Sequence, residues 1–387
     1  MEQKLKICHV ITRMIVGGAQ ENTLLTALGH IEKGHEVTLV TGPSPGPEGE
    51  LLKTKKISGL KIVVDENLVR EINPYRDISA YFSLKKLFLD NSFDVVHTHS
   101  SKAGVIGRLA ADAAKVPFIV HTVHGQAFHQ YEKAWKNFIY KKSEKIAARH
   151  CHKIFAVAQA MVDQCVAAGI AGPDKYKVVY SGIELAPFLN SADDCELRRK
   201  LGIPDNAPVI GTVARLFPLK GYEDFMPAAE IVSKKHPETC FLIVGDGIMK
   251  DSLKNWAESA KMKFFFTGLV PPSEVHKYTA LMDVLVHLSL REGLPRAVVQ
   301  GLASGKPAVG FELDGTPEVI INGKTGFTVK AGDVSGVSDK IIFLLENPEK
   351  AKEMGMAGRN MVSEKFDSRK MADILEEEYI RGLEGRK

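Results

Sequence analysis

The stretch from Phe93 to Gly125, "FDVVHTHSSKAGVIGRLAADAAKVPFIVHTVHG", contains the pattern most indicative of the fold class. It begins with an apolar run rich in β-branched residues, continues through an alanine-rich segment with helical spacing, and ends with a second apolar run after Pro117. Runs of these lengths are typical of a strand, a crossover helix and a second strand. The stretch therefore predicts a βαβ unit, in which the two strands are parallel.

The same alternation continues on both sides of this stretch. The runs "LKICHVIT" and "HEVTLVTG" come before it, and "KIFAVAQ" comes after it. The pattern weakens through Pro204 and Pro208, and then restarts with "PVIGTVAR", "CFLIVGDG", "KFFFTGLV", "VLVHLS" and "KPAVGFEL". Strands that alternate with longer helical segments predict an α/β protein, with helices on both faces of a parallel sheet.

The break near these prolines, in a chain of 387 residues, indicates two domains rather than one. We expect two doubly wound, Rossmann-like domains, the first over residues 1–185 and the second over residues 186–366. Residues 367–387 have the pattern of a C-terminal helix, which we expect to pack back toward the N-terminal domain.

The composition limits the classes of partner and compartment. The formal net charge is +4 and no block of Lys and Arg appears, which argues against nucleic acid as a partner. The five cysteines are scattered without a Cys-x-x-Cys pair, a pattern typical of a reducing compartment. No apolar run reaches about 18 residues. We therefore expect a cytoplasmic protein, able to lie peripherally on the inner face of the cytoplasmic membrane but not to cross it.

Two of the loops after predicted strands have residues suited to a charged ligand, which in open α/β sheets binds beyond the carboxyl ends of the strands. Gly17 and Gly18 follow the first strand, where glycines let a backbone approach a ligand at a helix N-terminus. Arg215 and Lys220 follow another strand and would suit a phosphate or diphosphate. A structural alternative stays open for each pair: a tight turn for the glycines, and solvated surface charge for the cations.

A third loop lies in "SLREGLPRAVVQGLASGKP", from Ser289 to Pro307, which joins a strand to a helix. Pro295 suits the first helical position, so N–H groups and the positive end of the helix dipole would face the loop that holds Glu292. An anion can bind there without a metal. Gln300 is a lone polar residue in the apolar "AVVQGLA", where burial costs stability unless the amide has a partner.

Histidines are concentrated early in the chain, where ten of the thirteen precede residue 153. They include His97 and His99 in "VVHTHS", and His121, His124 and His129 in "VHTVHGQAFH". Two such loops could form the metal site of a hydrolase, but no Asp-x-His or His-Glu-x-x-His spacing supports one, so we expect no metal. We favour a neutral histidine that donates a hydrogen bond to a ligand.

Together these motifs resemble those of the family-4 retaining glycosyltransferases, or group 1 glycosyltransferases. Their GT-B fold has two Rossmann-like domains that face each other across a cleft. The resemblance runs from "GGAQENTL" through "HTHSSKAGVIGRLAA", "HTVHG", "ARLFPLKG", "VGDG", "FTGLV", "SLREGLP" and "GTPEVI" to "GKTGFTV". It therefore covers nearly the whole chain, and it is specific for the family but not for the substrate.

By this resemblance, the C-terminal domain binds a nucleotide-sugar donor. Arg215 and Lys220 match the family's diphosphate-binding pair, and Glu292 matches the first acid of its Glu, seven residues, Glu motif, which contacts the donor sugar. The second acid of that motif, which accepts hydrogen bonds from the ribose, falls on Gln300, and here the sequence departs from the family. The other donor-side positions that the resemblance implies are Gly17, Gly18, Leu269, Gly293, Leu294 and Pro295.

The resemblance also implies that the N-terminal domain binds the acceptor. His124 matches the histidine near the transferred sugar, and His99 and His129 are further acceptor-side candidates. His124 would thus act in catalysis together with Arg215, Lys220 and Glu292. The reaction would move a hexose-type sugar, with retention, to a hydroxyl group, while the departing phosphate oxygen takes the proton of that hydroxyl.

The resemblance implies no metal and no cofactor, because the nucleotide sugar is a co-substrate. We favour a UDP-sugar over a GDP-sugar, and an acceptor that is lipid-linked and belongs to the synthesis of a cell-envelope glycolipid, lipopolysaccharide or other polysaccharide. Two alternatives stay open. One is a nucleotide-sugar 2-epimerase of the same fold, and the other is a degenerate, non-catalytic nucleotide-sugar-binding subunit, for which Gln300 is the hint.

The stretch from Tyr131 to Lys153 carries seven Lys and Arg against two Glu, interleaved with Trp135, Phe138 and neighbouring apolar residues. We expect it to help the protein rest on an anionic membrane. An ordinary amphipathic helix packed on the sheet, with one solvated face, is the alternative.

Overall fold

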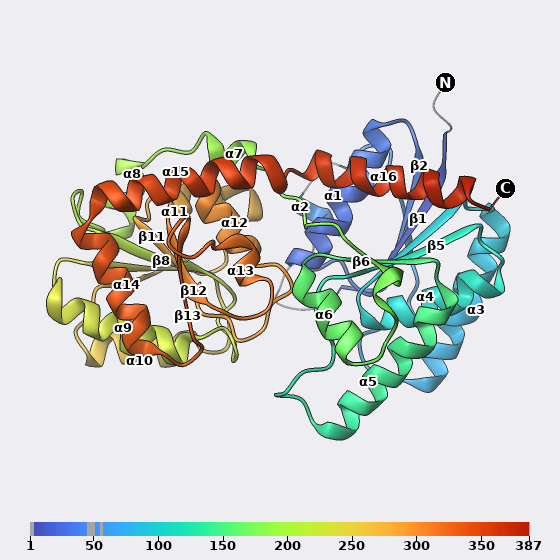
Figure 1. The fold of residues 1–387 in the computed structure, drawn as a ribbon, viewed down its shortest axis with the longest axis horizontal. Coiled ribbons are helices and arrows are strands. Elements are labelled where there is room, and N and C mark those ends of the chain that lie inside the picture. The colour runs from blue at the N-terminus through green and yellow to red at the C-terminus, as the bar shows by residue number, and fades with distance from the viewer. Residues whose placement is uncertain (1–3, 45–50, 55–56, 387) are drawn as a thin grey trace. The chain divides into compact units, whose positions relative to one another are not determined.

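The computed structural model describes residues 4–44, 51–54 and 57–386, and it divides into two compact units. The N-terminal unit extends to Gly182 and also contains the last segment of the chain, from Ser368 onward. The C-terminal unit spans Ile183–Asp367. Each unit is built around its own parallel sheet with helices on both faces (Figure 1), so the predicted pair of doubly wound α/β domains is confirmed.

The N-terminal sheet has seven strands in the order β3-β2-β1-β4-β5-β6-β7, and all neighbouring strands are parallel. The strands are β1 (Lys6–Ile11), β2 (Glu36–Thr41), β3 (Lys61–Val64), β4 (Val95–His99), β5 (Phe118–Val123), β6 (Lys153–Ala156) and β7 (Tyr176–Val178). The helices are α1 (Gly18–Glu32), α2 (Leu51–Thr54), α3 (Pro74–Asn91), α4 (Ser101–Ala113), α5 (Ala134–Ala147), α6 (Gln159–Ala167) and α16 (Ser368–Glu384). Short 3₁₀ turns lie at Ala148–His150 and Pro173–Lys175.

The βαβ unit expected around residues 93–125 is formed by β4, α4 and β5. Small residues let α4 approach the sheet closely, because a Cβ atom at Gly107 would lie 2.8 Å from Thr98 Cγ2. At Gly104 a Cβ atom would lie 2.6 Å from the ring of His121. Helix α4 contacts both α3 and α5, so these three helices cover one face of the sheet.

The last helix, α16, packs beside α1 on the other face of the N-terminal sheet (Figure 1). A Cβ atom at Gly29 of α1 would lie 2.6 Å from the Ala372 side chain, which shows how close the two helices are. Met371, Leu375 and Tyr379 of α16 are buried in the same core as the apolar residues of β1 and β5. The chain therefore returns to the N-terminal unit after it has completed the C-terminal one.

The C-terminal sheet has six strands in the order β10-β9-β8-β11-β12-β13, again with parallel neighbours. The strands are β8 (Val209–Val213), β9 (Cys240–Val244), β10 (Phe264–Phe266), β11 (Val284–His287), β12 (Ala308–Phe311) and β13 (Gly326–Val329). The helices are α7 (Ala186–Leu189), α8 (Cys195–Leu201), α9 (Tyr222–Lys235), α10 (Lys250–Ser259), α11 (Val275–Ala280), α12 (Arg296–Ala303), α13 (Thr316–Val319), α14 (Val334–Glu346) and α15 (Pro348–Lys365), with a 3₁₀ turn at Pro272–Glu274.

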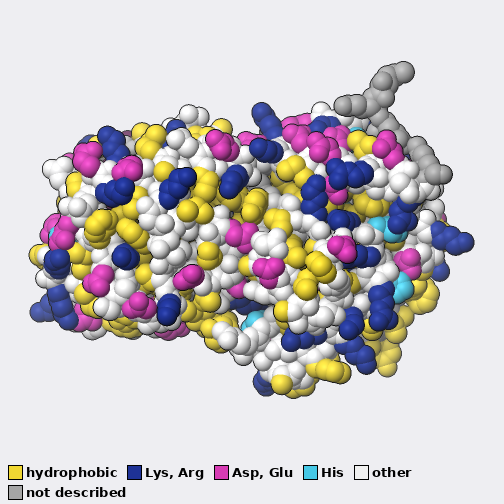
Figure 2. Space-filling model, viewed as in Figure 1, with side chains coloured by type: hydrophobic (Ala, Val, Ile, Leu, Met, Phe, Trp, Pro, Cys, Tyr) yellow, Lys and Arg dark blue, Asp and Glu magenta, His cyan; other side chains and the backbone are white. Residues whose placement is uncertain are grey.

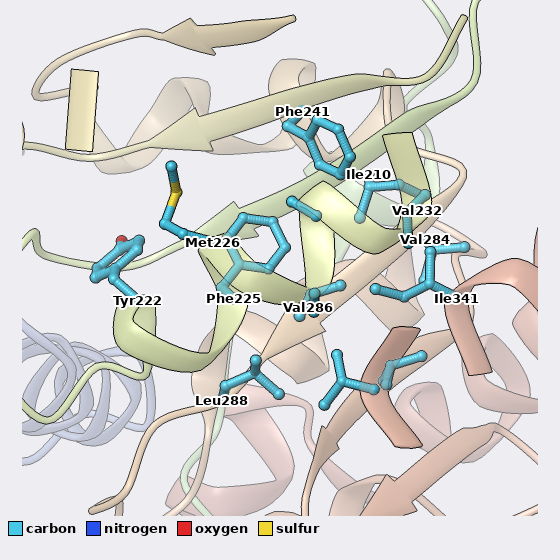
Figure 3. Packing of buried hydrophobic residues seen from close by; sticks show 14 of the residues in the cluster. Ile210, Tyr222, Phe225, Met226, Val232, Phe241, Val284, Val286, Leu288 and Ile341 are labelled. Carbon is cyan, nitrogen blue, oxygen red and sulfur yellow. The ribbon is translucent and has the colours of Figure 1, made fainter. Parts of the chain in front are cut away.

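The C-terminal core forms where α9 meets the strands of this sheet. Phe225 and Met226 of α9 belong to one buried cluster with Ile210 of β8, Phe241 of β9 and Val286 of β11 (Figure 3). All five side chains are nearly inaccessible to solvent. Their burial stabilises the strand ends from which the loops of the candidate site emerge.

Each sheet has a point at which the strand order reverses. In the N-terminal sheet β1 lies between β2 and β4, and in the C-terminal sheet β8 lies between β9 and β11. The loops that leave neighbouring strands at such a point run in opposite directions and leave a crevice, where ligands of α/β proteins bind. The described part of the chain contains no helix that is both long and apolar enough to cross a membrane.

Candidate functional site

The loops after β8 and β11 bring an ammonium group to a carboxylate in the C-terminal unit. Lys220 Nζ lies 2.5 Å from Glu292 Oε1 and 3.5 Å from the Ser289 hydroxyl. Strands β8 and β11 are neighbours at the switch point, which is why loops far apart in the sequence meet there. Both side chains are mostly buried, with exposed fractions of 20% for Lys220 and 22% for Glu292. Two residues predicted for the donor site are therefore in direct contact.

Glu292 is held as a carboxylate. Burial by itself raises the pKa of this group, but the charge and hydrogen bond of Lys220 outweigh burial and leave the pKa below its ordinary value. The imidazole of His287 lies 3.8 Å from the same carboxylate, and burial lowers its pKa to about 4. Near neutral pH the group thus consists of an ionised acid, a cation and a neutral imidazole.

Backbone contacts hold these two loops in place. The backbone N–H of Glu292 donates a 2.7 Å hydrogen bond to Asp314 Oδ2, which follows β12. Gly221, directly after Lys220, has a φ of 77°, and a Cβ atom there would lie 2.0 Å from the carbonyl oxygen of Leu288. A side chain would therefore push the Lys220 loop away from the end of β11, so this position requires glycine.

Arg215 follows the end of β8, where the backbone packs against the loop after β9. Gly245 has a φ of 143°, and a Cβ atom there would lie 2.0 Å from the carbonyl oxygen of Ala214. The side chain of Arg215 is exposed, and its guanidinium carbon lies 5.2 Å from the centre of the Phe217 ring. Arg215 thus emerges at the same switch point as Lys220. Leu269, another predicted donor-side residue, follows β10 and is 56% exposed.

The helix after Glu292 begins one residue later than predicted. Pro295 was expected to be the first helical residue, but it is the N-cap, because its ψ of 86° is not helical and α12 starts at Arg296. Gly293, Leu294 and Pro295 are buried beneath the loop. The positive end of the α12 dipole still points toward the loop that holds Glu292.

Gln300 lies within α12 and is partly buried. Its neighbour Gly301 faces the sheet, where a Cβ atom would lie 2.8 Å from the side chain of Leu285 on β11. The helix therefore sits close to the strand that leads to Glu292. Gln300 and Glu292 belong to one strand–loop–helix segment, as the sequence predicts.

The Gly17–Gly18 pair lies at the start of α1, after β1. Gly17 is the N-cap and Gly18 is the first residue of the helix. The φ of Gly17 is 178°, an extended conformation that any residue adopts. A Cβ atom at Gly17 would meet only the flexible end of Gln20, at 2.8 Å. The fold therefore does not require glycine at this position.

His124 belongs to a row of three histidines in the N-terminal unit. His99 Nδ1 lies 3.0 Å from His124 Nε2, and His99 Nε2 lies 3.0 Å from His9 Nδ1. His9 and His99 are buried in β1 and β4, whereas His124 follows β5 and is partly exposed. His129 lies in the loop that leads into α5, where its backbone exchanges hydrogen bonds with the side chain of Asn137.

The nitrogen atoms of His9, His97 and His99 lie within 4.8 Å of one another, so we tested this cluster as a metal site. Both ring nitrogens of His97 already have partners, the Tyr379 hydroxyl at 2.5 Å and the Thr122 hydroxyl at 2.6 Å. A metal ligand must keep one nitrogen for the ion. The geometry therefore favours a hydrogen-bonded network over a preformed metal site.

Some residues of the site were not predicted from the sequence. Asp314 and Ser289 bind the Glu292 loop, and His9 extends the histidine row, yet none of the three was singled out. The available signal was position, because Ser289 and Asp314 follow β11 and β12 by two or three residues. His9 lies inside a strand and carried no comparable signal.

Two family models match the two halves of this chain. The model of glycosyltransferase family 4 matches residues 16–186, and the model described as glycosyl transferases group 1 matches residues 193–361. The chain belongs to the group 1 glycosyltransferases. This glycosyltransferase therefore transfers a sugar from a nucleotide donor. Its two units, each built around one sheet, are the two domains of the GT-B fold.

Curated relatives of this glycosyltransferase include bacterial enzymes named for sugars linked by a diphosphate to undecaprenol. One is the UDP-Gal:alpha-D-GlcNAc-diphosphoundecaprenol alpha-1,3-galactosyltransferase of Escherichia coli, which is 28% identical over 381 residues, covering 97% of each chain. Another is the N,N'-diacetylbacillosaminyl-diphospho-undecaprenol alpha-1,3-N-acetylgalactosaminyltransferase of Campylobacter jejuni, which is 26% identical over 78% of this chain and 81% of the relative.

Among solved structures, HepE of Anabaena in complex with UDP is similar to this glycosyltransferase, with a TM-score of 0.81. The match covers 96% of this chain and 99% of HepE at 20% sequence identity. At that identity the likeness shows the shared GT-B fold.

Proposed function

We propose that this glycosyltransferase transfers a hexose-type sugar, with retention of configuration, from a UDP-sugar to a hydroxyl group of a lipid-linked acceptor. The observation that carries the proposal is the contact between Lys220 and Glu292 at the switch point of the C-terminal sheet. A cation and an acid that touch there can bind opposite ends of one ligand, the diphosphate and the sugar. The start of α12 adds the positive end of a helix dipole to the same loop.

The cationic groups would assist departure of the nucleoside diphosphate. When the bond between the anomeric carbon and the β-phosphate oxygen breaks, negative charge develops on that oxygen. Lys220, Arg215 and the α12 dipole are preorganised positive charges that stabilise it as it grows. The sequence has no Asp-x-Asp pair of the kind that would chelate a metal-bound diphosphate. We therefore propose that the reaction is independent of a metal ion.

Glu292 would bind the sugar rather than the phosphate. Its carboxylate can accept hydrogen bonds from sugar hydroxyls, and a diphosphate that binds Lys220 would release the carboxylate from its 2.5 Å ion pair. Ligand binding would thus replace the Lys220–Glu292 ion pair with two new contacts, Lys220 to the diphosphate and Glu292 to the sugar hydroxyls. The acceptor oxygen then bonds to the anomeric carbon on the face that the phosphate leaves, and its proton passes to the leaving phosphate oxygen.

The proposed classes of donor and acceptor are based on the names of similar proteins. HepE binds UDP, and the Escherichia coli and Campylobacter jejuni enzymes are named for acceptors in which a sugar is joined by a diphosphate to undecaprenol. We propose the same classes here, with UDP favoured over GDP. His124, in the domain assigned to the acceptor, would act on the transferred group rather than on the nucleotide.

A lipid-linked acceptor requires that the enzyme reach a membrane, and we propose that α5 and α3 make that contact. In α5 the side chains of Trp135 and Phe138 are 57% and 66% exposed, and Ala147 is its only buried residue within the described chain. The ammonium groups of Lys136 and Lys142 lie 5.8 Å from these two rings. Figure 2 shows Lys and Arg side chains among hydrophobic ones over this region. This arrangement supports a membrane surface better than a helix packed on the sheet.

Helix α3, which like α5 contacts α4, has a second row of exposed apolar side chains. Tyr75, Ile78, Phe82 and Leu89 are 86%, 58%, 61% and 56% exposed, and their spacing places them along one side of the helix. Exposed apolar patches of this kind mark interaction surfaces. The α3–α5 surface, defined by these residues with Trp135 and Phe138, would insert its apolar groups while lysines meet anionic headgroups.

The proposed reaction can be tested directly. The enzyme would be incubated with UDP- and GDP-sugars and a synthetic lipid-diphosphate sugar acceptor, with and without EDTA, and the product examined by mass spectrometry and NMR of the anomeric centre. We expect a disaccharide with the configuration of the donor, equally with EDTA. A free, epimerised nucleotide sugar would indicate the epimerase, and binding without transfer or hydrolysis would indicate a non-catalytic subunit.

A further inference from the structure

The imidazole of His287 is buried beside the Lys220–Glu292 ion pair, and the proposed reaction gives it no role. His287 is the last residue of β11, and its side chain is 5% exposed. Its Nε2 atom lies 3.8 Å from Glu292 Oε1, which is beyond hydrogen-bond distance. This nitrogen forms no hydrogen bond with any other described residue. A buried polar atom of this kind requires an explanation.

The alternation of side chains along β11 places this ring on the α12 side of the sheet. Val286 belongs to the buried cluster that contains residues of α9, whereas Leu285 faces Gly301 of α12. His287 is two residues beyond Leu285 and therefore points to the same side of the sheet. Since it ends the strand, its ring lies next to the loop that carries Glu292 and leads into α12.

Lys220 and His287 are two possible partners for the Glu292 carboxylate. Lys220 Nζ lies 2.5 Å from Oε1, whereas His287 Nε2 is about 1 Å too far away for a hydrogen bond. Burial lowers the pKa of His287 to about 4, so near pH 7 the ring is neutral and has one N–H group. The negative oxygen attracts an N–H at Nε2 and repels a lone pair there. The terminal torsion of a glutamate is broad, and rotation of the carboxylate can close the gap.

We propose that His287 is a positioning residue that binds the Glu292 carboxylate in place of Lys220 when the diphosphate of the donor binds Lys220. The Nε2–H group of His287 then donates to Oε1, and Oε2 accepts hydrogen bonds from the sugar hydroxyls. The buried carboxylate thus keeps a donor and stays ionised while the ammonium group neutralises phosphate. This role rests on the proposed function, whereas the ability of His287 to pair with Glu292 does not.

Replacing Lys220 by methionine tests the pairing without any ligand, because it removes the competing cation. Glu292 raises the pKa of His287 and Lys220 lowers it, so in Lys220→Met we expect the pKa of His287 to rise by about one pH unit or more. NMR titration of the enzyme labelled with ¹³C at histidine Cε1 measures this change, with the signal assigned from His287→Gln. An unchanged pKa overturns the proposal whatever the activity.

Two controls separate pairing with the carboxylate from the simple loss of a positive charge. Lys234→Met removes a lysine that pairs with Glu230 on the surface of α9, and it should leave the titration of His287 as in the wild type. The double variant with Lys220→Met and Glu292→Gln lacks the carboxylate, so the rise in pKa should disappear. A rise that persists in the double variant would come from the lost charge alone and would overturn the proposal.

Binding and kinetics test the positioning role. His287→Leu should weaken UDP binding about fivefold and lower kcat about tenfold, because the carboxylate that Lys220 leaves then has no donor. In His287→Gln the side-chain amide can donate from near the position of Nε2, so it should restore most of both quantities. In a Glu292→Gln background, His287→Leu should cost little UDP affinity. A glutamine variant as impaired as the leucine variant would show that the ring serves packing, and would overturn the role.

The outcomes also separate this role from the function on which it rests. A wild type that neither binds UDP nor transfers a sugar would overturn the proposed function and the exchange of partners with it, even where the pKa of His287 rises in Lys220→Met. Normal UDP binding and transfer by the wild type, combined with full activity of His287→Leu, would overturn the positioning role alone.

Discussion

Lys220 Nζ and Glu292 Oε1 lie 2.5 Å apart although 72 residues separate them in the chain. The contact exists because β8 and β11 are adjacent parallel strands, and each delivers its following loop to the same edge of the sheet. Under the proposed function, the diphosphate and the sugar of the donor would take the place of this ion pair.

Replacing Lys220 by methionine should weaken UDP binding about 10- to 100-fold, because a charge-assisted contact to the diphosphate is lost. It should also lower kcat, since the charge on the phosphate grows in the transition state. Calorimetry and a transfer assay measure the two effects. Lys234→Met is a suitable control, because Lys234 pairs with Glu230 on the surface of α9. Equal UDP affinity in both variants would remove Lys220 from the donor site.

Gln300→Glu should tighten UDP binding about fivefold, because a carboxylate accepts a ribose hydroxyl more strongly than an amide does. Gln300→Leu should weaken it by a similar factor. Titration calorimetry with UDP compares the three proteins. If the leucine variant binds UDP as well as the wild type, Gln300 is a packing residue of α12.

His124→Ala should lower kcat strongly and leave UDP affinity nearly intact, because His124 belongs to the unit that does not carry the Lys220–Glu292 pair. Steady-state kinetics and UDP titration separate these quantities. The variant to compare with it is Lys220→Met, for which both kcat and UDP affinity should fall. A histidine variant with the turnover rate of the wild type would contradict the proposed role.

The double change of Lys141 and Lys142 to Glu should weaken binding to vesicles with about 30% anionic lipid, and added salt should weaken binding of the wild type. Co-sedimentation measures the bound fraction. Lys324 and Lys330 changed to Glu give the same change of net charge in the C-terminal unit, where both are exposed. Equal binding to neutral and anionic vesicles would exclude the electrostatic contribution.

Acid should destabilise the N-terminal unit more than the C-terminal one. Burial lowers the pKa of six described histidines of the N-terminal unit, His9, His30, His97, His99, His121 and His152, but of His287 alone in the described C-terminal unit. Below an unfolded pKa of about 6.5 the unfolded chain therefore binds more protons than the folded one. The free energy of unfolding then falls by up to about 1.4 kcal/mol per histidine for each pH unit.

Urea unfolding, followed for each unit by hydrogen-exchange mass spectrometry at about pH 7 and pH 5.5, tests this expectation. The stability contributed by these neutral histidines is complete above their unfolded pKa and is lost as the pH falls below it. Carboxylates with lowered pKa values, such as Glu292, act only below about pH 4.5. Equal shifts of the urea midpoint in both units would contradict the prediction.

Local sequence pattern was sufficient for the two parallel sheets, because strand and helix periodicity depend on nearby residues. The short outer strands β3, β7 and β13 were not predicted, since they have three or four residues and no continuous buried run. Candidate site residues at strand ends could also be predicted from the sequence. Lys220, Glu292 and His124 all follow apolar runs, and ligands of α/β folds bind beyond the carboxyl ends of the strands.

Local sequence thus predicts most of the helices and strands, and it predicts which reactive side chains lie at their ends. Which of those ends meet depends on the packing of segments that are distant in the chain. The order of strands around each switch point, set by packing between distant segments, joins Lys220 to Glu292 and places His9 behind His99. The return of α16 to α1 likewise depends on buried contacts across the chain. Such contacts have no local periodicity, because they arise only when side chains from separate elements share one buried space.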